Sequence, residues 1–455
     1  MKQDKGISKT AAIVYYAVVA IVCLVPSVGL LFGGGEVSSD SDAAPAPKLT
    51  NDDGTFNFNV MADAGEWFDD HFAFRNEWVT AAAAVEGIFG VSPNESVVQG
   101  RDGWLYYGDS VEDFQGAKQL SDRALYDIAH TMKLVQTHAL GRGIDFAFCI
   151  APNKNTLYGQ NMPYYLQVKV GESNLDRIVA FLDSEGVNYV DARSLFEGRN
   201  DVLYHKRDSH WNNEGAAMVS DALLKELGRA HRSYADESFT VRDDFTGDLD
   251  KMLYPSAPSP EDEVYYDNAP EFDYVTQGVQ SNFDPKIATS SASATGGSLV
   301  MYRDSFCNSL LPFMAEAYSQ AYFSRGVPYQ LAIDLEAHNA DALVIERAQR
   351  FMRDMAANPP MMPAPLVLDE AVTGSSAFKA LEGLEEQPQG EYLLVTGKLG
   401  REMAVGERIA VRVNDSLVYE AFGKCDAETG DEGFQLLLPK SIAGENSNEY
   451  ELLIW

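Results

Sequence analysis

Short apolar segments alternate with helical patterns between residues 121 and 345, and this alternation constrains the fold more than any other feature. A helical face is formed by residues that recur at steps of three and four: Leu125, Ile128, Met132 and Val135. The segment IDFAFCI at residues 144–150 follows and is typical of a strand buried on both faces. Further strand candidates come later: VNYV at 187–190, SLVMY at 298–302, QAYF at 320–323 and DALVI at 341–345. Strands that alternate with helices favour an α/β sandwich around a mostly parallel sheet.

Two more helices fit this order. The first is predicted over residues 175–182 and is closed by Gly186, and the second begins at Asn212 or Asn213 and continues to Leu227. Between about residues 247 and 297 the chain becomes acidic and rich in Pro, Tyr, Ser and Asp, without a usable period. Loops of this length are usually functional or disordered, so we expect a lid or surface excursion there.

A serine follows one of the predicted strands. In open α/β sheets ligands gather beyond the carboxyl ends of the strands, and Ser305 comes directly after the strand at 298–302. A helix that starts there would offer backbone N–H groups and its positive dipole end to a developing oxyanion. A serine at such a junction is also a common helix cap, so its position alone does not identify a nucleophile.

The segment YHKRDSHWNNEGA at residues 204–216 gives a stronger signal. Asp208 and His210 lie two residues apart just before a predicted helix, so the carboxylate can hold one imidazole nitrogen while the other faces a nucleophile. Histidine has an unperturbed pKa of about 6.5 and can take and return a serine proton near neutral pH. The structural alternative is a histidine that caps the helix or packs against Trp211.

A metal site is a second alternative for this segment. His205, Asp208 and His210 could present two imidazoles and one carboxylate to a metal ion. No other histidine-rich spacing completes a zinc or iron set, whereas a serine already stands at a suitable position. We therefore favour a catalytic triad of Ser305, His210 and Asp208 that uses no metal and no cofactor.

The N-terminal region predicts a membrane anchor. The uncharged, mostly apolar run from Ala11 to Phe32 is long enough, at about 1.5 Å per residue, to cross a hydrocarbon layer of roughly 30 Å. Three lysines precede it and three acidic residues follow it: Lys2, Lys5, Lys9, Glu36, Asp40 and Asp42. The positive-inside rule then places the N-terminus in the cytoplasm and the rest of the chain outside the cell membrane.

A cleaved signal peptide is the rival interpretation of this run. Its apolar core usually spans about 7 to 15 residues and ends at a small-residue cleavage site. The run here is longer, and GLLFGGGE at its end lacks an A-x-A pattern. We therefore expect an uncleaved anchor at residues 1–32, followed by a flexible linker at 33–55 that is rich in Gly, Ser, Asp and Pro.

The formal charge of −33 argues against nucleic acid as a partner, because such binding depends on Lys and Arg that neutralise phosphates. After a proline cluster at 359–365, segments such as EYLLVTGKL and GFQLLLPK alternate apolar and polar residues. This pattern predicts a small β-sandwich-like domain over residues 366–455. Its role is either contact with carbohydrate or packing that shields the main sheet.

Four segments together resemble a known family. They are DDHFAFRNEW followed by GRDGWLYYGD near 69–109, APNKNTLY at 151–158, D-S-H-W at 208–211 and R-D-S-F at 303–306. In content and order they resemble the SGNH hydrolase-like domain of alginate O-acetyltransferases of the AlgJ/AlgX type and the related DHHW proteins. The resemblance covers roughly residues 56–355, and we set the domain at 56–358. It implies an SGNH fold in which the acid Asp208 and the base His210 precede the nucleophile Ser305.

The resemblance also implies a function. Family members act with a membrane-bound O-acyltransferase that passes acetyl groups outward, and they acetylate polysaccharides. Ser209 stands where the name DHHW has a histidine, which leaves the subfamily and the acceptor open. Lys154, Tyr158, Arg303 and Trp211 are candidates for orienting substrate or supporting the oxyanion, while Lys154 and Arg303 could equally neutralise neighbouring aspartates.

From these observations we expect an extracytoplasmic acetyltransferase. Ser305 would take an acetyl group and pass it to a sugar hydroxyl. A carbohydrate acetyl esterase would use the same residues, and a non-catalytic polysaccharide-binding scaffold would keep only the fold.

Overall fold

A computed structural model describes residues 9–30, 44–51, 53–279, 281–381, 383–415, 417–426, 429–442 and 448–455. The chain divides into two compact units. The first contains Met1–Gly108, Lys206–Asp208 and Asp244–Glu261, and the second contains the remaining segments up to Trp455. The predicted catalytic domain at 56–358 therefore draws on both units.

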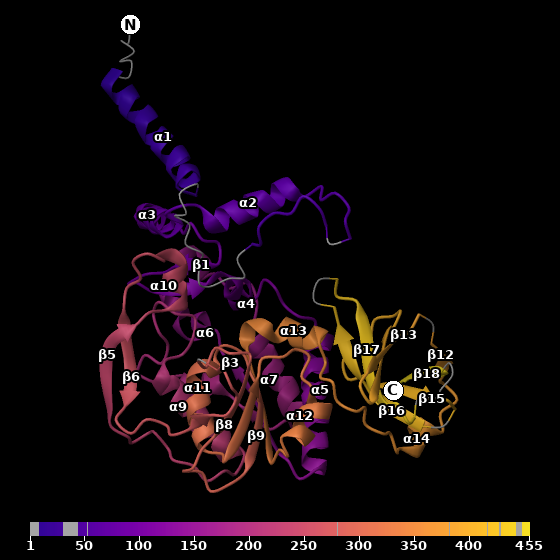
Figure 1. Ribbon diagram of the computed structural model, residues 1–455. Coiled ribbons are helices and arrows are strands. Elements are labelled where there is room, and N and C mark those ends of the chain that lie inside the picture. Colours follow the sequence, from indigo (N-terminus) through magenta and orange to yellow (C-terminus); the bar gives the residue numbers. More distant parts are fainter. Residues whose placement is uncertain are drawn as a thin grey trace. The chain divides into compact units, whose positions relative to one another are not determined.

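The first unit contains the N-terminal helix and a small core. Its elements are α1 Lys9–Leu30, α2 Val60–His71, α3 Arg75–Gly87, β1 Val97–Gln99, β2 Leu105–Tyr107 and α10 Asp248–Leu253 (Figure 1). Strands β1 and β2 form an antiparallel pair. The core side chains come from α3, both strands and α10: Ala83, Val97, Leu105, Leu249 and Leu253.

Helix α1 agrees with the predicted apolar segment. It is 22 residues long, none of its residues is buried, and its length and hydropathy suffice to cross a membrane. Residues 1–8 and 31–43 lie outside the described part, and so do Lys2, Lys5, Glu36, Asp40, Asp42 and most of the predicted linker. The described end of that linker packs on the unit, because the backbone N–H of Ala44 donates to Asp70 at 2.9 Å.

The second unit is built around a seven-stranded sheet in the order β4-β3-β11-β9-β10-β8-β7. In that order the strands are Tyr189–Val190, Asp145–Ala151, Ala342–Ala348, Ser298–Tyr302, Gln320–Ser324, Lys286–Ser290 and Asp273–Tyr274. The five strands from β4 to β10 are parallel, while β8 and β7 add antiparallel pairs at one edge. The predicted α/β sandwich with a mostly parallel sheet is confirmed.

The segment at 247–297, for which we expected a lid or surface excursion, contains regular structure that the sequence did not predict: α10, β6 (Glu261–Tyr266), β7 and β8. Strand β8 has the sequence KIATS, in which only Ile287 and Thr289 are buried. So short a segment carries almost no apolar period, and its strand conformation depends on pairing with β10. Strand β5 (Phe239–Phe245), exposed along nearly its whole length, also lacked a sequence signal.

Helices cover both faces of the sheet and give it two cores. One core includes side chains of α5 Asp122–Gly141, α7 Asn174–Glu185, α12 Leu331–Ala337 and α13 Met352–Ala357. The other includes side chains of α8 Ala192–Phe196, α9 Asn213–Glu226 and α11 Cys307–Glu316. Two short helices, α4 Val111–Gln115 and α6 Lys154–Tyr158, complete this part. Both faces are therefore buried, as the continuous apolar strands predicted.

The C-terminal part is an all-β domain, as predicted, with one sheet in the order β12-β18-β15-β16-β17-β14-β13. In that order the strands are Lys379–Ala380, Tyr450–Ile454, Ile409–Val413, Leu417–Cys425, Glu432–Pro439, Tyr392–Lys398 and Glu385–Gln389, and the short helix α14 (Glu370–Thr373) precedes them. Strand β16 pairs with β15 through its first half and with β17 through its second half. The two halves of the sheet share β16 and enclose one apolar core.

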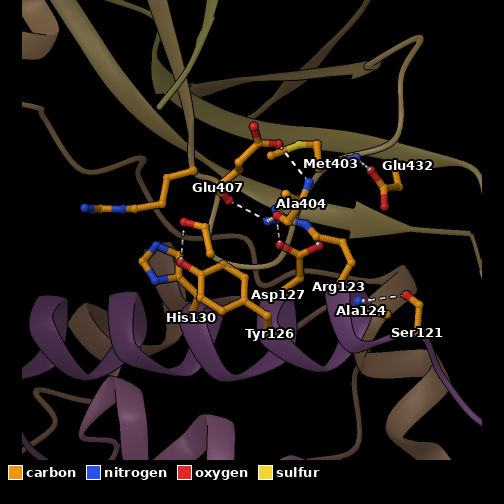
Figure 2. A network of polar contacts seen from close by, with 12 residues as sticks. Ser121, Arg123, Ala124, Tyr126, Asp127, His130, Met403, Ala404, Glu407 and Glu432 are labelled. Carbon is orange, nitrogen blue, oxygen red and sulfur yellow. Dashed lines mark hydrogen bonds and ion pairs between the residues drawn. The ribbon is translucent and has the colours of Figure 1, made fainter.

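A buried polar network joins helix α5 to the β-domain (Figure 2). Arg123 forms a two-point contact with Asp127 one turn along α5 and donates to the carbonyl oxygens of Ala404 at 3.1 Å and Glu407 at 2.5 Å. The carboxylate of Asp127 lies against Gly423 of β16, where an added Cβ would come within 2.2 Å of Oδ1. The ion pair therefore fits only because β16 has no side chain at that position.

A second set of polar contacts between α5 and the β-domain centres on His130 of α5. Its Nδ1 lies 2.8 Å from Glu185, and its Nε2 lies 2.8 Å from Glu420 of β16, which also receives Arg408. Burial alone would lower the pKa of His130, but hydrogen bonds to Glu420 and Glu185 outweigh burial and raise it. The imidazole thus favours its charged form, which can donate to both carboxylates.

We expect Gly423→Ala to destabilise the packing of α5 on the β-domain, because the new methyl group must displace the Asp127 carboxylate from its contact with β16. The free energy of unfolding should fall by about 1–3 kcal/mol, measured by denaturant titration. Gly141→Ala is the matched control, since nothing lies within 4 Å of an added Cβ there. Equal stability of the two variants would contradict this account of the packing.

Candidate active site

Ser305 and His210 meet at the carboxyl edge of the main sheet. Strand β9 ends at Tyr302, and Ser305 lies in the turn between that strand and helix α11. The Nε2 atom of His210 lies 2.8 Å from the Oγ atom of Ser305. Both side chains are half-buried, so the pair is partly open to solvent. The two segments that sequence reasoning selected are 95 residues apart and are brought into hydrogen-bond contact.

The start of helix α9 positions His210. Asn212 caps this helix by accepting a hydrogen bond from the backbone N–H of Gly215 at 2.9 Å, as predicted. The imidazole packs edge-on against the ring of Phe306, with centroids 4.8 Å apart. On its other side, Nδ1 lies 3.2 Å from the hydroxyl of Ser209. The ring is held between the nucleophile turn and its own segment, so its orientation toward Ser305 is fixed.

Trp211 connects the segment that contains His210 to the turn that contains Ser305. Its side chain is completely buried, and its indole N–H donates to the backbone carbonyl of Phe306 at 3.0 Å. The rings of Trp211 and Phe306 are also in edge-to-face contact at 4.9 Å. Trp211 therefore braces the residue that follows Ser305, which is a structural task rather than contact with substrate.

Asp304 fixes the nucleophile turn to the neighbouring strand. Its Oδ1 accepts from the backbone N–H of Phe306 at 2.9 Å, and its Oδ2 accepts from that of Ala348, at the end of β11, at 2.6 Å. The backbone N–H of Asp304 donates to Oε2 of Glu346, also on β11, at 3.1 Å. One of these hydrogen bonds closes the turn around Ser305, and the other two tie the turn to β11, the strand next to β9.

Glu346 is a fully buried carboxyl group beside this turn. Burial raises its pKa well above the usual value, and the negative charge of Asp304 adds to the rise. In the described part of the chain its Oε1 atom has no hydrogen-bond partner. The raised pKa therefore favours the protonated form of Glu346, which can still accept the Asp304 N–H.

Contacts of the remaining predicted residues favour the structural alternative. Arg303 is fully buried and donates to the Asn308 side chain at 2.8 Å and to the carbonyls of residues 282 and 284 at 2.8 and 2.7 Å. Lys154 is buried and donates to the carbonyl of His205 at 3.0 Å. The Tyr158 hydroxyl accepts from the backbone N–H of Leu203 at 2.9 Å. These side chains hold the loops behind the site in place.

Asp208 belongs to the first compact unit, while His210 and Ser305 belong to the second. Its carboxylate is buried and accepts from the backbone N–H of Asp248 at 2.7 Å. Its role as the acid of a triad remains a prediction that rests on its place two residues before His210. For the metal alternative, Nε2 of His205 lies 3.0 Å from Glu263 and Nε2 of His210 faces Ser305. The two imidazoles have different partners, which favours proton transfer over shared metal binding.

Sequence reasoning missed three buried polar residues near this edge: Asn153, Asp304 and Glu346. Asn153 lies two residues after the end of β3, and neither polar atom of its side chain has a partner within the described residues. An asparagine at the carboxyl end of a buried strand was a usable signal, because such positions face the ligand edge. Glu346 offered no signal, since its burial depends on the order of the strands.

Comparison with known families agrees with the fold and with the motifs. Residues 97–283 match the family model described as SGNH hydrolase-like domain, acetyltransferase AlgX. The matched segment includes Asp208 and His210 and ends before Ser305. The resemblance to the AlgJ/AlgX type that the sequence motifs indicated is confirmed.

A curated relative and two solved structures show the extent of the similarity. The chain is 23% identical over 166 residues to the probable alginate O-acetylase AlgJ of Pseudomonas aeruginosa, which covers 36% of this chain and 41% of that protein. It thus spans about two fifths of that relative. PatB1 of Bacillus cereus aligns with a TM-score of 0.45 at 14% identity, covering 56% of this chain and 96% of PatB1. A DHHW family protein of Eubacterium siraeum aligns with a TM-score of 0.40 at 14% identity, covering 56% and 91%.

Replacing Glu346 or Asp304, the two carboxyl groups beside Ser305, with the neutral amide should have opposite effects on the stability of the folded protein. The folded protein keeps a proton on Glu346 that the unfolded chain releases above about pH 4.3, so its stability falls as the pH rises from there toward the raised pKa. Glu346→Gln has no proton to release. Its free energy of unfolding relative to wild type should therefore rise between about pH 5 and pH 8.

Asp304→Asn is the matched variant, because both Asp304 oxygens accept backbone N–H groups and an amide must turn its NH₂ toward one of them. It should lose about 1–3 kcal/mol at every pH in this range. Thermal and urea unfolding at several pH values measure both variants. Loss of stability with rising pH that persists unchanged in Glu346→Gln would contradict the protonated state of Glu346.

Proposed function

We propose that this chain transfers acetyl groups to hydroxyls of an exported or cell-surface polysaccharide, because residues 97–283 match the family model described as SGNH hydrolase-like domain, acetyltransferase AlgX. The contact of 2.8 Å between His210 Nε2 and Ser305 Oγ carries the proposal. This is the distance at which an imidazole can accept a serine proton while the oxygen attacks.

The reaction proceeds in two steps. In the first, Nε2 of His210 takes the Ser305 proton, and Oγ attacks the carbonyl carbon of an acetyl donor. The C–O bond to the donor then breaks, and the donor leaves with the proton from His210, so that an acetyl ester remains on Ser305. In the second step a sugar hydroxyl gives its proton to His210 and attacks the ester. The acetylated sugar leaves, and the proton returns to Ser305.

Two features lower the energy of these steps. The positive end of helix α11 begins at Cys307, just after Ser305, and favours the negative charge that develops on the carbonyl oxygen. In our proposal Asp208 stabilises the imidazolium that forms on His210, as the acid of a triad does. The packing of Phe306 and Trp211 holds the imidazole and the Ser305 turn in the same relative position during both steps.

The proposed location follows from helix α1. We propose that α1 anchors the chain in the cell membrane with the domain on the extracytoplasmic side, where the polysaccharide acceptor is. Acetyl groups must then cross the membrane, and a membrane-bound O-acyltransferase is the partner that we propose as their source.

Replacing Ser305 or His210 should abolish acetyl transfer. We expect Ser305→Ala and His210→Gln to reduce kcat for a chromogenic acetyl ester by on the order of 10³-fold or more, and Asp208→Asn by roughly 10²- to 10⁴-fold. Ser184→Ala, which removes an exposed hydroxyl on α7, is the control and should keep full activity. Circular dichroism checks that each variant is folded.

An equal rate in wild type and Ser305→Ala would overturn the serine mechanism. Activity that depends on Ser305 would exclude a scaffold without catalysis. Oligosaccharides then separate the two enzymatic functions, because a transferase adds an acetyl mass increment to the sugar, whereas an esterase releases only acetate. Removal of acetyl groups from an acetylated oligosaccharide, without transfer, would favour the esterase.

A further inference from the structure

The connection between α2 and α3 packs against the end of helix α1. The backbone N–H of Ala73 donates to the carbonyl of Pro26 at 3.3 Å, and Ala73 is completely buried. A Cβ at Gly29 would lie 2.2 Å from the Cβ of Ala73, so this approach needs a glycine in α1. The last turns of α1 and the α2–α3 connection therefore form one packed junction within the first unit (Figure 1).

This junction fixes the depth of the α2–α3 connection once α1 is placed in a membrane. At about 1.5 Å per residue, the 22 residues of α1 measure about 33 Å, close to the roughly 30 Å of a hydrocarbon layer. Pro26 and Gly29 then lie near the outer boundary of that layer. Ala73 contacts both, so the start of α3 lies at the headgroup level.

Helix α3 ends in an exposed apolar segment, which we call the α3 tip and define as Val85, Ile88, Phe89 and Val91. The exposed fractions of Ile88 and Phe89 are 80% and 77%, and those of Val85 and Val91 are 57% and 53%. Val85, Ile88 and Phe89 are spaced three and four residues apart, so they share one side of the helix end. Phe74, at the junction itself, is also half exposed.

The charges near the α3 tip restrict what can cover it. The charged side chains of α3 and the preceding turn include acidic groups at both ends, Glu77 and Glu86, and one cation, Arg75. A surface of this kind gains little from anionic lipid headgroups, which attract Lys and Arg. It is suited to apolar contact with acyl chains at the membrane boundary, where aromatic and aliphatic side chains are stabilised.

We propose that the α3 tip inserts into the outer leaflet of the membrane that α1 crosses, so that the enzyme is held on the bilayer surface by two contacts. The inference rests on the proposed membrane placement of α1. Its consequence for function is orientation, because a second contact restricts rotation of the first unit about a single helix. The lipid contact is apolar, and neutral phosphatidylcholine should suffice for it.

Site-specific fluorescence in vesicles tests the proposal. The full chain is reconstituted in phosphatidylcholine vesicles, and an environment-sensitive dye is attached to a single exposed cysteine. Wild type carries the dye on Cys23 of α1, since Cys149, Cys307 and Cys425 are buried. In a Cys23→Ser background, Ile88→Cys and Phe89→Cys report the α3 tip. Leu368→Cys is the matched control, because Leu368 is 79% exposed in the second unit.

Spin-labelled lipids should quench the dye at Cys23 and at both α3 positions at least about twofold more than at the Leu368 position. Replacing a third of the lipid with phosphatidylglycerol should leave this ratio unchanged. Quenching at Cys23 without quenching at the α3 positions would overturn the α3 tip proposal and leave the anchor intact. Absence of quenching at Cys23 would overturn the anchor, and the α3 tip proposal with it. A blue-shifted α3 signal without lipid quenching would indicate protein contact and would also overturn the proposal.

Discussion

The hydrogen bond between His210 and Ser305 depends on the parallel order of the central strands. Strands β3, β11 and β9 run in one direction, so the segments that follow them emerge at the same edge of the sheet. Ser305 follows β9 directly, and helix α9, which begins behind His210, packs against α11 in the core on one face. Two side chains 95 residues apart in the chain meet there at 2.8 Å.

The site is stabilised mainly by buried side chains on the core side of Ser305. Asp304 ties the nucleophile turn to the end of β11, while Trp211 and Arg303 brace it from the core and from the loop at 282–284. Most of these groups are buried and bind backbone atoms, so their contribution is to hold Ser305 still rather than to touch substrate. Preorganisation of this kind matters because small displacements of a nucleophile reduce its rate of attack. The raised pKa of Glu346 favours its neutral form, which lowers the repulsion between this carboxyl group and Asp304.

The sequence allowed accurate prediction wherever a local pattern was complete. The strand at 298–302 has the predicted bounds, and Asn212 caps its helix because an asparagine before a helical pattern has few other roles. Strands β7 and β8 escaped prediction because each is short and stabilised by pairing along the sheet edge. The roles of Arg303 and Lys154 stayed open for a different reason: in the sequence, a charged side chain near a predicted site looks alike whether it faces substrate or backbone. In the structure, the hydrogen bonds that both side chains donate to backbone carbonyls favour the structural role.

The central claim is that Ser305 carries the acetyl group between donor and acceptor. Mass spectrometry of the peptide that contains Ser305, after rapid acid quench of the protein with an acetyl ester and no sugar acceptor, measures this directly. We expect one acetyl group on Ser305, which disappears when an acceptor oligosaccharide is added and does not form in His210→Gln. Continued turnover without acetyl on Ser305, or with acetyl on another residue, would contradict the account.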